Sequence, residues 1–156
     1  MKNEIFDQNI RIEYPDDYSL MSDAEIKKFF ASDLPRMGVR NVEKHTILSV
    51  SKTKNSLLSL ITDEKSVLAG AERSFKRLNG YTPMEEFDEE IFGKPAKGVR
   101  FAYSAIAGDK NVRQFCEMTV VKMKRCFCVV YCLARLDDEQ ESKETFAAFR
   151  RSLQIV

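Results

Sequence analysis

The chain has 156 residues, of which 44% are hydrophobic and 31% charged, a length and composition typical of one soluble domain. Lys and Arg number 25 and Asp and Glu 24, so the formal net charge is +1. This balance excludes a polybasic nucleic-acid coat protein and an acidic disordered tail. No apolar run approaches the roughly 18 residues of a membrane span. We therefore expect a single domain over residues 1–156 that uses neither a nucleic acid nor a membrane as its partner.

The N-terminus and the cysteines indicate the compartment. Residues 1–7 contain no apolar run and no small-residue cleavage site, so they do not form a secretory signal. Cys116, Cys126, Cys128 and Cys132 all lie in apolar, β-rich segments. Disulfide frameworks belong to small secreted chains without an adequate core, so we expect reduced thiols and a cytoplasmic location.

The first elements follow from short local patterns. Residues 9–14 alternate apolar and polar side chains, which predicts a half-buried strand that ends at the turn begun by Pro15. Ser22 and Glu25 have the spacing of a capping box, which predicts a short helix that stops before Pro35.

The middle of the chain predicts one more strand and a longer helix. Residues 44–52 alternate as a strand does, whereas the apolar run at 57–61 fits either a third short strand or the start of a helix. From Asp63 onward the apolar spacing is helical, and Asn79-Gly80 supplies a C-terminal stop.

The remainder predicts a four-stranded meander closed by a helix. The candidate strands are 84–91, 99–106, 112–122 and 126–134, and their short connections require antiparallel neighbours. The apolar stripe of Phe146, Phe149 and Leu153 predicts the last helix. The fold class is therefore α+β: an antiparallel sheet of these four strands plus two or three N-terminal strands, sandwiched between helices.

Aligning apolar residues across the strands predicts the register. A two-residue turn at 123–124 sets Val120 opposite Phe127, and centring the previous turn on 109–110 sets Phe101 opposite Met118. Pairing Ile91 with Val99 then completes one apolar face that needs a helix over it. The other face would carry acidic residues on its first strand and cysteines on its last: Glu86, Asp88, Glu90, Cys126, Cys128 and Cys132.

None of the reactive side chains forms a recognisable catalytic pattern. Cys126 and Cys128 are same-face neighbours about 7 Å apart along a strand, too far for a disulfide or a shared zinc, so we interpret them as buried apolar side chains. His45, the only histidine, lies beside charged residues at a strand start and is predicted to be solvated. The acidic run at 85–90 indicates a solvated edge strand rather than a calcium site. We predict no catalytic residue, metal site or cofactor, and phosphate-binding glycine motifs are absent.

The basic residues of the meander indicate a docking patch. Alternate turns of a meander lie at the same end of a sheet, so the turns at 92–98 and 123–124 should meet and Asp109 should lie at the far end. They would bring together Lys94, Lys97, Lys122, Lys124 and Arg125. Such a patch fits a protein partner with an acidic surface. The alternative interpretation is a set of lysines on solvated turns.

Two segments resemble the PsbP-like superfamily, which includes the photosystem II extrinsic subunit P, the Ran-binding nuclear import factor and many small bacterial proteins. Residues 10–18, Ile-Arg-Ile-Glu-Tyr-Pro-Asp-Asp-Tyr, are similar to the family's opening strand and turn. Residues 145–153, Thr-Phe-Ala-Ala-Phe-Arg-Arg-Ser-Leu, are similar to its closing helix. The resemblance implies a sheet between helices and an accessory or binding role, and it transfers no catalytic residue. Many bacterial relatives look like exported lipoproteins, whereas this chain has no lipobox cysteine near its start.

These observations predict a small bacterial cytoplasmic protein that acts as a non-enzymatic accessory module docking a protein partner, as a monomer or weak homodimer. The alternative is a small-molecule or metal-dependent enzyme that uses the acidic and cysteine-bearing sheet face. A third alternative is a structural subunit of an oligomer, which exposed apolar side chains at residues 57–61 would favour.

Overall fold

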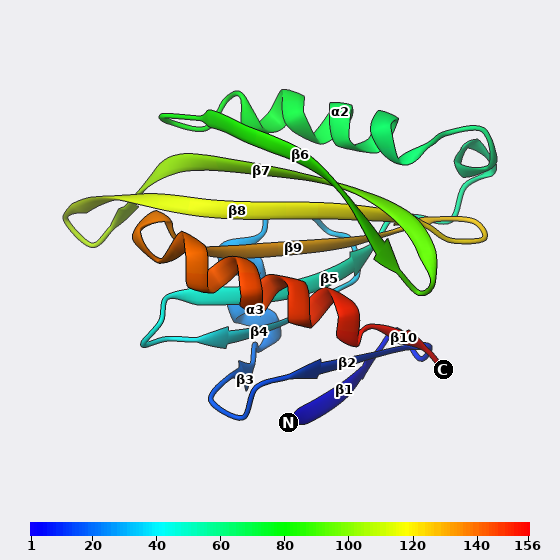
Figure 1. Ribbon diagram of the computed structural model, residues 1–156, viewed down its shortest axis with the longest axis horizontal. Coiled ribbons are helices and arrows are strands. Elements are labelled where there is room, and N and C mark those ends of the chain that lie inside the picture. The colour runs from blue at the N-terminus through cyan, green and yellow to red at the C-terminus, as the bar shows by residue number, and fades with distance from the viewer.

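A computed structural model describes residues 1–156, and its largest element is a seven-stranded antiparallel sheet (Figure 1). Its strand order is β3 (Ser19–Leu20), β4 (Arg36–Asn41), β5 (Thr46–Lys52), β9 (Phe127–Arg135), β8 (Lys110–Lys122), β7 (Lys94–Ala107) and β6 (Thr82–Ile91). A small second sheet consists of β1 (Lys2–Phe6), β2 (Ile10–Tyr14) and β10 (Gln154–Ile155), with both chain ends beside it.

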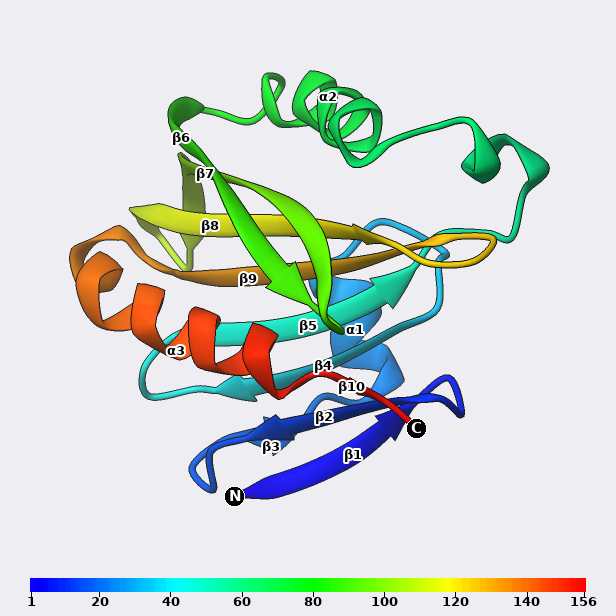
Figure 2. The ribbon, with the colours of Figure 1, turned by 45° about the vertical axis from the view of Figure 1, so that its right-hand side comes forward.

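Helices cover both faces of the large sheet. They are α1 (Asp23–Phe29), α2 (Glu64–Phe75) and α3 (Glu139–Ser152), with short 3₁₀ helices η1 (Leu57–Leu60) and η2 (Leu136–Asp138). Figures 1 and 2 show α2 above the sheet and α3 on the other side, between the large sheet and the small one. The predicted α+β class, with an antiparallel sheet between helices, is confirmed. No helix has the length and apolar character to cross a membrane.

The two faces of the sheet carry separate apolar cores. The larger core has 19 buried residues and lies between the sheet, α3 and β2, where Phe115 stacks on Phe146 with ring centroids 5.9 Å apart. The smaller core lies under α2 and is built from Leu68 and buried side chains of β8 and β9. Burying one large aliphatic or aromatic side chain contributes roughly 1.5–3 kcal/mol, so α3 and β2 close the more stable of the two layers.

Several predicted elements are confirmed. Ser22 and Glu25 make both hydrogen bonds of the capping box at the start of α1. Asp63 caps α2 by accepting from the backbone N–H of Ser66. The predicted stop at Asn79-Gly80 is wrong, because the helix ends at Phe75 and Gly80, with φ +64°, lies in the loop that follows it. The four C-terminal strands form the predicted antiparallel meander.

Two of the predicted registers are wrong by two residues each. Val120 faces Val129 because the loop between β8 and β9 has four residues, 123–126, rather than two. Phe101 faces Cys116 because the preceding turn is Gly108-Asp109. Side chains alternate with period two, so an even shift leaves these strands with their predicted faces.

The register of β6 is wrong by an odd number, which reverses its faces. Ile91 faces Lys94, not Val99, because Phe92 and Gly93 both have positive φ and close a two-residue hairpin in place of the predicted turn at 92–98. Gly98 lies inside β7 because the ring of Phe87 fills the space where a Cβ would stand. A bulge between Pro83 and Glu85 shifts the pairing again.

Four strands have no counterpart in the sequence prediction: β1, β3, β4 and β10. In β4 the outward side chains are polar, and Gly38 lets Met21 and Ile26 approach the backbone, so apolar alternation is weak there. The ambiguous run at 57–61 proves to be η1 and the residue that follows it.

Candidate functional site

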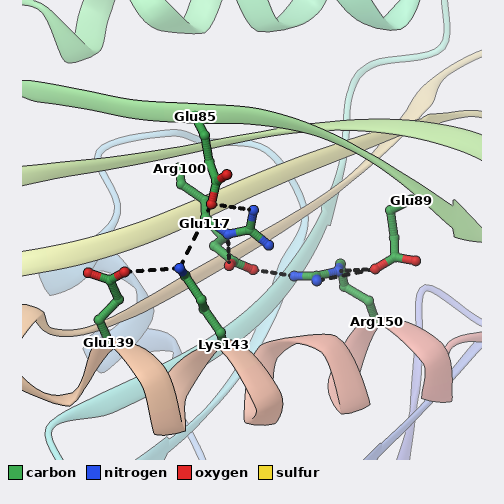
Figure 3. Close-up of polar contacts among 7 residues, drawn as sticks. All are labelled: Glu85, Glu89, Arg100, Glu117, Glu139, Lys143 and Arg150. Atoms are coloured by element: carbon green, nitrogen blue, oxygen red, sulfur yellow. Dashed lines mark hydrogen bonds and ion pairs between the residues drawn. The ribbon is translucent and has the colours of Figure 1, made fainter.

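A chain of charged side chains lies between α3 and the large sheet (Figure 3). Glu117, on β8, is 1% exposed, and its two oxygens accept from different arginines. Arg100 Nε on β7 donates to one oxygen at 2.6 Å, and Arg150 Nη1 on α3 donates to the other. Glu85 binds Arg100 at 2.9 Å, and Glu89 binds Arg150 at 3.2 Å. Lys143 extends the network from α3 to Glu85 and Glu139.

This network connects α3 to the sheet through paired charges. Glu117 is 1% exposed and each of its carboxylate oxygens pairs with a guanidinium group, so a substrate has no access to it. Arg100 also lies 3.9 Å from the ring centroid of Phe87, which fixes its orientation. A cavity of about 600 Å³ adjoins the network and is lined by Arg150 and Glu89. The guanidinium group of Arg150 already forms ion pairs with Glu89 and Glu117. Sequence reasoning missed the network because its members come from three distant segments. The signal that could have found it is a charged residue in the middle of the apolar run 115–121.

The cysteines are buried on two different faces. Cys128 and Cys132 lie in the core under α3, whereas Cys116 lies on the α2 side, where the Tyr131 hydroxyl donates to it at 3.4 Å. Burial raises the pKa of Cys116 to about 12 and that of Cys128 to about 12. It raises the pKa of Cys132 as well. A neutral, inaccessible thiol is a poor nucleophile, so these residues act as apolar side chains.

The acidic row of β6 lies on the face opposite to Cys128 and Cys132. Glu86 and Asp88 line a cleft of about 460 Å³ between α2 and the β6–β7 hairpin, and Glu90 lines the cavity at Arg150. Asp88 is exposed, and the hydrogen bond and charge of Lys97 hold the pKa of its carboxyl below its usual range. The predicted shared face of acidic residues and cysteines is therefore wrong. No group of three or more His, Cys, Asp or Glu side chains is placed to hold a metal ion. His45 is exposed in the turn between β4 and β5, with φ +53°.

The predicted cations lie at one end of the sheet but are not equivalent. Lys124 and Arg125 are exposed in the β8–β9 loop and make no side-chain hydrogen bond or ion pair. Ala96 in β7 pairs with Val121, which lies next to the β8–β9 loop. Lys94 is exposed at the start of β7, two residues before Ala96, so it lies at the same end of the sheet as that loop. Lys97 is engaged with Asp88 on the α2 face, so it does not join the others. We call Lys94, Lys122, Lys124 and Arg125 the basic end.

A run of exposed apolar side chains lies beside the basic end. In η1 and the residue after it, Leu57 is 76% exposed, Leu58 68%, Leu60 58% and Ile61 84%. In Figures 1 and 2 this segment, between β5 and α2, projects from the same end of the molecule as the β8–β9 loop. We call these four side chains the apolar tip.

Hydrogen bonds fasten the apolar tip to the basic end. The backbone N–H of Ser56 donates to the carbonyl of Arg125 at 3.0 Å. Lys122 Nζ donates to the carbonyl of Thr62 at 2.9 Å and to that of Leu60 at 3.4 Å. The apolar tip is thus held in its exposed position by three bonds to β8 and its loop. This assembly of cations and apolar side chains is the candidate functional site.

Comparison with known proteins identifies the fold. No protein-family model matches the sequence, and no curated protein matches it. Among solved structures, the cyanobacterial PsbP of Synechocystis sp. (CyanoP) superposes with a TM-score of 0.62 at 12% identity, covering 94% of this chain and 86% of CyanoP. LpqN of Mycobacterium tuberculosis, a protein involved in cell envelope biogenesis, superposes with a TM-score of 0.57 at 18% identity, covering 94% of this chain and 83% of LpqN.

The chain therefore has a PsbP-like fold, as the resemblance of its opening and closing segments indicates. At these identities the similarity concerns the arrangement of the backbone. Function has to be argued from this chain's own surface.

Proposed function

We propose that the protein is a non-enzymatic binding module that docks an anionic partner through the basic end. The observation that carries this proposal is the pair Lys124 and Arg125, two exposed cations with no counter-ion, which lie beside an exposed apolar tip. Exposed charges of one sign steer association with a surface of the opposite sign, and neighbouring apolar area stabilises the complex once it forms.

The side chains that could support catalysis are paired, buried or far from one another, which favours a binding function over an enzymatic one. Glu117 is fully engaged by two arginines, and the buried cysteines have raised pKa values. Glu86 and Asp88 of β6 and the cysteines of β9 lie on opposite faces of the sheet, so they do not share a site.

The fold is consistent with an accessory role. LpqN is described by its involvement in cell envelope biogenesis and CyanoP as a cyanobacterial PsbP, and neither description names a reaction. The positive charge of the basic end is complementary to the acidic protein surface expected from the sequence. An anionic lipid surface has the same sign of charge as that protein surface.

Charge reversal tests the proposal. The immobilised protein is incubated with a lysate of the source cells, before and after removal of membranes by centrifugation, and salt eluates are compared by mass spectrometry. We expect the Lys94→Glu/Lys124→Glu/Arg125→Glu variant to lose salt-sensitive capture by tenfold or more. A matched control, Lys27→Glu/Lys28→Glu/Lys110→Glu, reverses three exposed cations elsewhere and should retain it. Equal capture by the two variants would contradict the proposal.

A further inference from the structure

We infer that the anionic surface is a lipid headgroup layer, and that the apolar tip inserts into it while the basic end contacts the phosphates. This inference rests on the proposed function and names the class of its partner. It concerns contact with the membrane surface, because no helix of the chain is a candidate span.

The geometry of η1 places aliphatic side chains over most of its exposed surface. A 3₁₀ helix has three residues per turn, so side chains at i and i+3 lie above one another. Leu57 and Leu60 form one ridge, and Leu58 and Ile61 form a second. On the third ridge Ser56 is exposed, whereas Ser59 is buried against the protein and its hydroxyl donates to the Ser56 carbonyl at 2.7 Å.

Hydrogen bonds within the protein satisfy several polar groups of the segment. The Ser56 hydroxyl accepts from the backbone N–H of Leu58 at 3.1 Å, and the Thr62 hydroxyl donates to the Leu58 carbonyl at 2.8 Å. Lys122 satisfies the carbonyls of Leu60 and Thr62. Backbone groups that enter the hydrocarbon of a bilayer need hydrogen-bond partners within the protein, and four carbonyls of this segment already have them.

A lipid surface fits this shape better than a protein groove or a second copy of the chain. A helix that binds in a protein groove presents anchors at i, i+3, i+4 and i+7, whereas the apolar tip spans only residues 57–61 on a projecting segment (Figure 2). A two-fold dimer through the apolar tip would bring Lys124 and Arg125 close to their own copies and so set like charges against each other. Cations next to exposed aliphatic side chains match anionic headgroups above an apolar layer.

Vesicle binding tests the inference. Purified protein is sedimented with phosphatidylcholine vesicles that contain or lack phosphatidylserine, at low and high salt. We expect binding only to the phosphatidylserine vesicles, weakened by salt. The Leu58→Asp/Ile61→Asp variant should lose about 30-fold or more in affinity, because it replaces two inserting aliphatic side chains with anions.

The matched control is Val42→Asp/Ile106→Asp, which changes two apolar side chains that are 62% and 79% exposed outside the apolar tip. This control should bind as the unaltered chain does, and all variants should keep the same thermal unfolding midpoint. Equal binding by the tip variant and the control would overturn the inference. So would absence of vesicle binding, or an unaltered chain that dimerises through the apolar tip in sedimentation velocity.

The outcomes also separate the inference from the proposed function. If charge reversal abolishes capture of an acidic protein while no vesicle is bound, the docking function stands and the lipid assignment fails. If charge reversal changes neither capture nor vesicle binding, both fail.

Discussion

Glu117 is buried at the centre of the α3 face, with each carboxylate oxygen accepting from a different arginine. Removing it would leave Arg150, itself 2% exposed, with only Glu89 as a partner. Breaking a buried ion pair by deleting one member costs about 3–5 kcal/mol, so Glu117→Ala should lower the free energy of unfolding by that amount. Urea denaturation measures it.

Two comparisons make the Glu117 prediction specific. In an Arg150→Met background the same substitution should cost less, because one of the two buried cations that it would strand is already gone. Asp88→Asn, which removes an exposed ion pair with Lys97, should leave the unfolding midpoint nearly unchanged. Equal losses in both backgrounds would mean that Arg150 and Glu117 do not act together.

The buried thiols predict a loss of stability at alkaline pH. Burial raises the pKa of Cys116 from 9.0 to about 12 in the folded protein, so above about pH 9 the thiol ionises only on unfolding. The unfolded state then binds fewer protons than the folded state, and stability decreases as pH rises. Each such thiol contributes a slope of about 1.4 kcal/mol per pH unit.

Urea denaturation over a series of pH values checks this slope. Cys116→Ala should make the decline of stability between about pH 9 and about pH 12 shallower by one thiol's contribution. An unchanged slope would show that Cys116 does not titrate on unfolding in this range.

Within the secondary-structure elements, alanine substitutions at two glycines should have opposite effects on stability. At Gly98 in β7 an added Cβ would lie 2.3 Å from a carbon of the Phe87 ring, whereas at Gly70 in α2 the nearest atom is Arg73 Nη2 at 3.7 Å. Gly98→Ala should therefore destabilise the fold by about 1–3 kcal/mol through displacement of the ring. Gly70→Ala should stabilise it by about 0.5–1 kcal/mol through helix propensity. Thermal unfolding of the two variants compares them directly, and a stabilising Gly98→Ala would contradict the packing described for Phe87.

The elements that local patterns specify could be predicted from the sequence, and those that depend on remote contacts could not. The Ser22–Glu25 capping box and the cap of α2 at Asp63 need only neighbouring residues. The placement of β6 depends on the local hairpin at Phe92-Gly93 and on the packing of Phe87 over Gly98, and only the second is a remote contact. The charged network likewise joins residues from β6, β7, β8 and α3.

The candidate site was predicted in part. Alternation of turns in a meander placed Lys94, Lys122, Lys124 and Arg125 at one end of the sheet, and the structure agrees with that placement. Lys97 was grouped with them, but it is paired with Asp88 on the α2 face. The sequence singled out residues 57–61 as apolar, but their exposure depends on the bonds that hold η1 away from the sheet.

In the whole molecule, the face that α3 covers and the proposed binding end lie apart. The α3 face is filled by the larger core and the charged network, whereas the apolar tip and the basic end project from one end of the sheet. Because docking depends on a few exposed cations, raising the salt concentration should weaken vesicle binding without altering the unfolding midpoint. Salt-insensitive binding would contradict the role of Lys124 and Arg125.

The chain contains no tryptophan, so the fluorescence of a single introduced tryptophan depends only on the environment of that position. Fluorescence of Leu58→Trp, titrated with vesicles containing phosphatidylserine, shows directly whether the apolar tip inserts into lipid, with Ile106→Trp as the control at another exposed site. The account predicts that emission from position 58 shifts to shorter wavelength and becomes quenchable by brominated lipid, while emission from position 106 stays unchanged. No shift at position 58, or an equal shift at both positions, would contradict it.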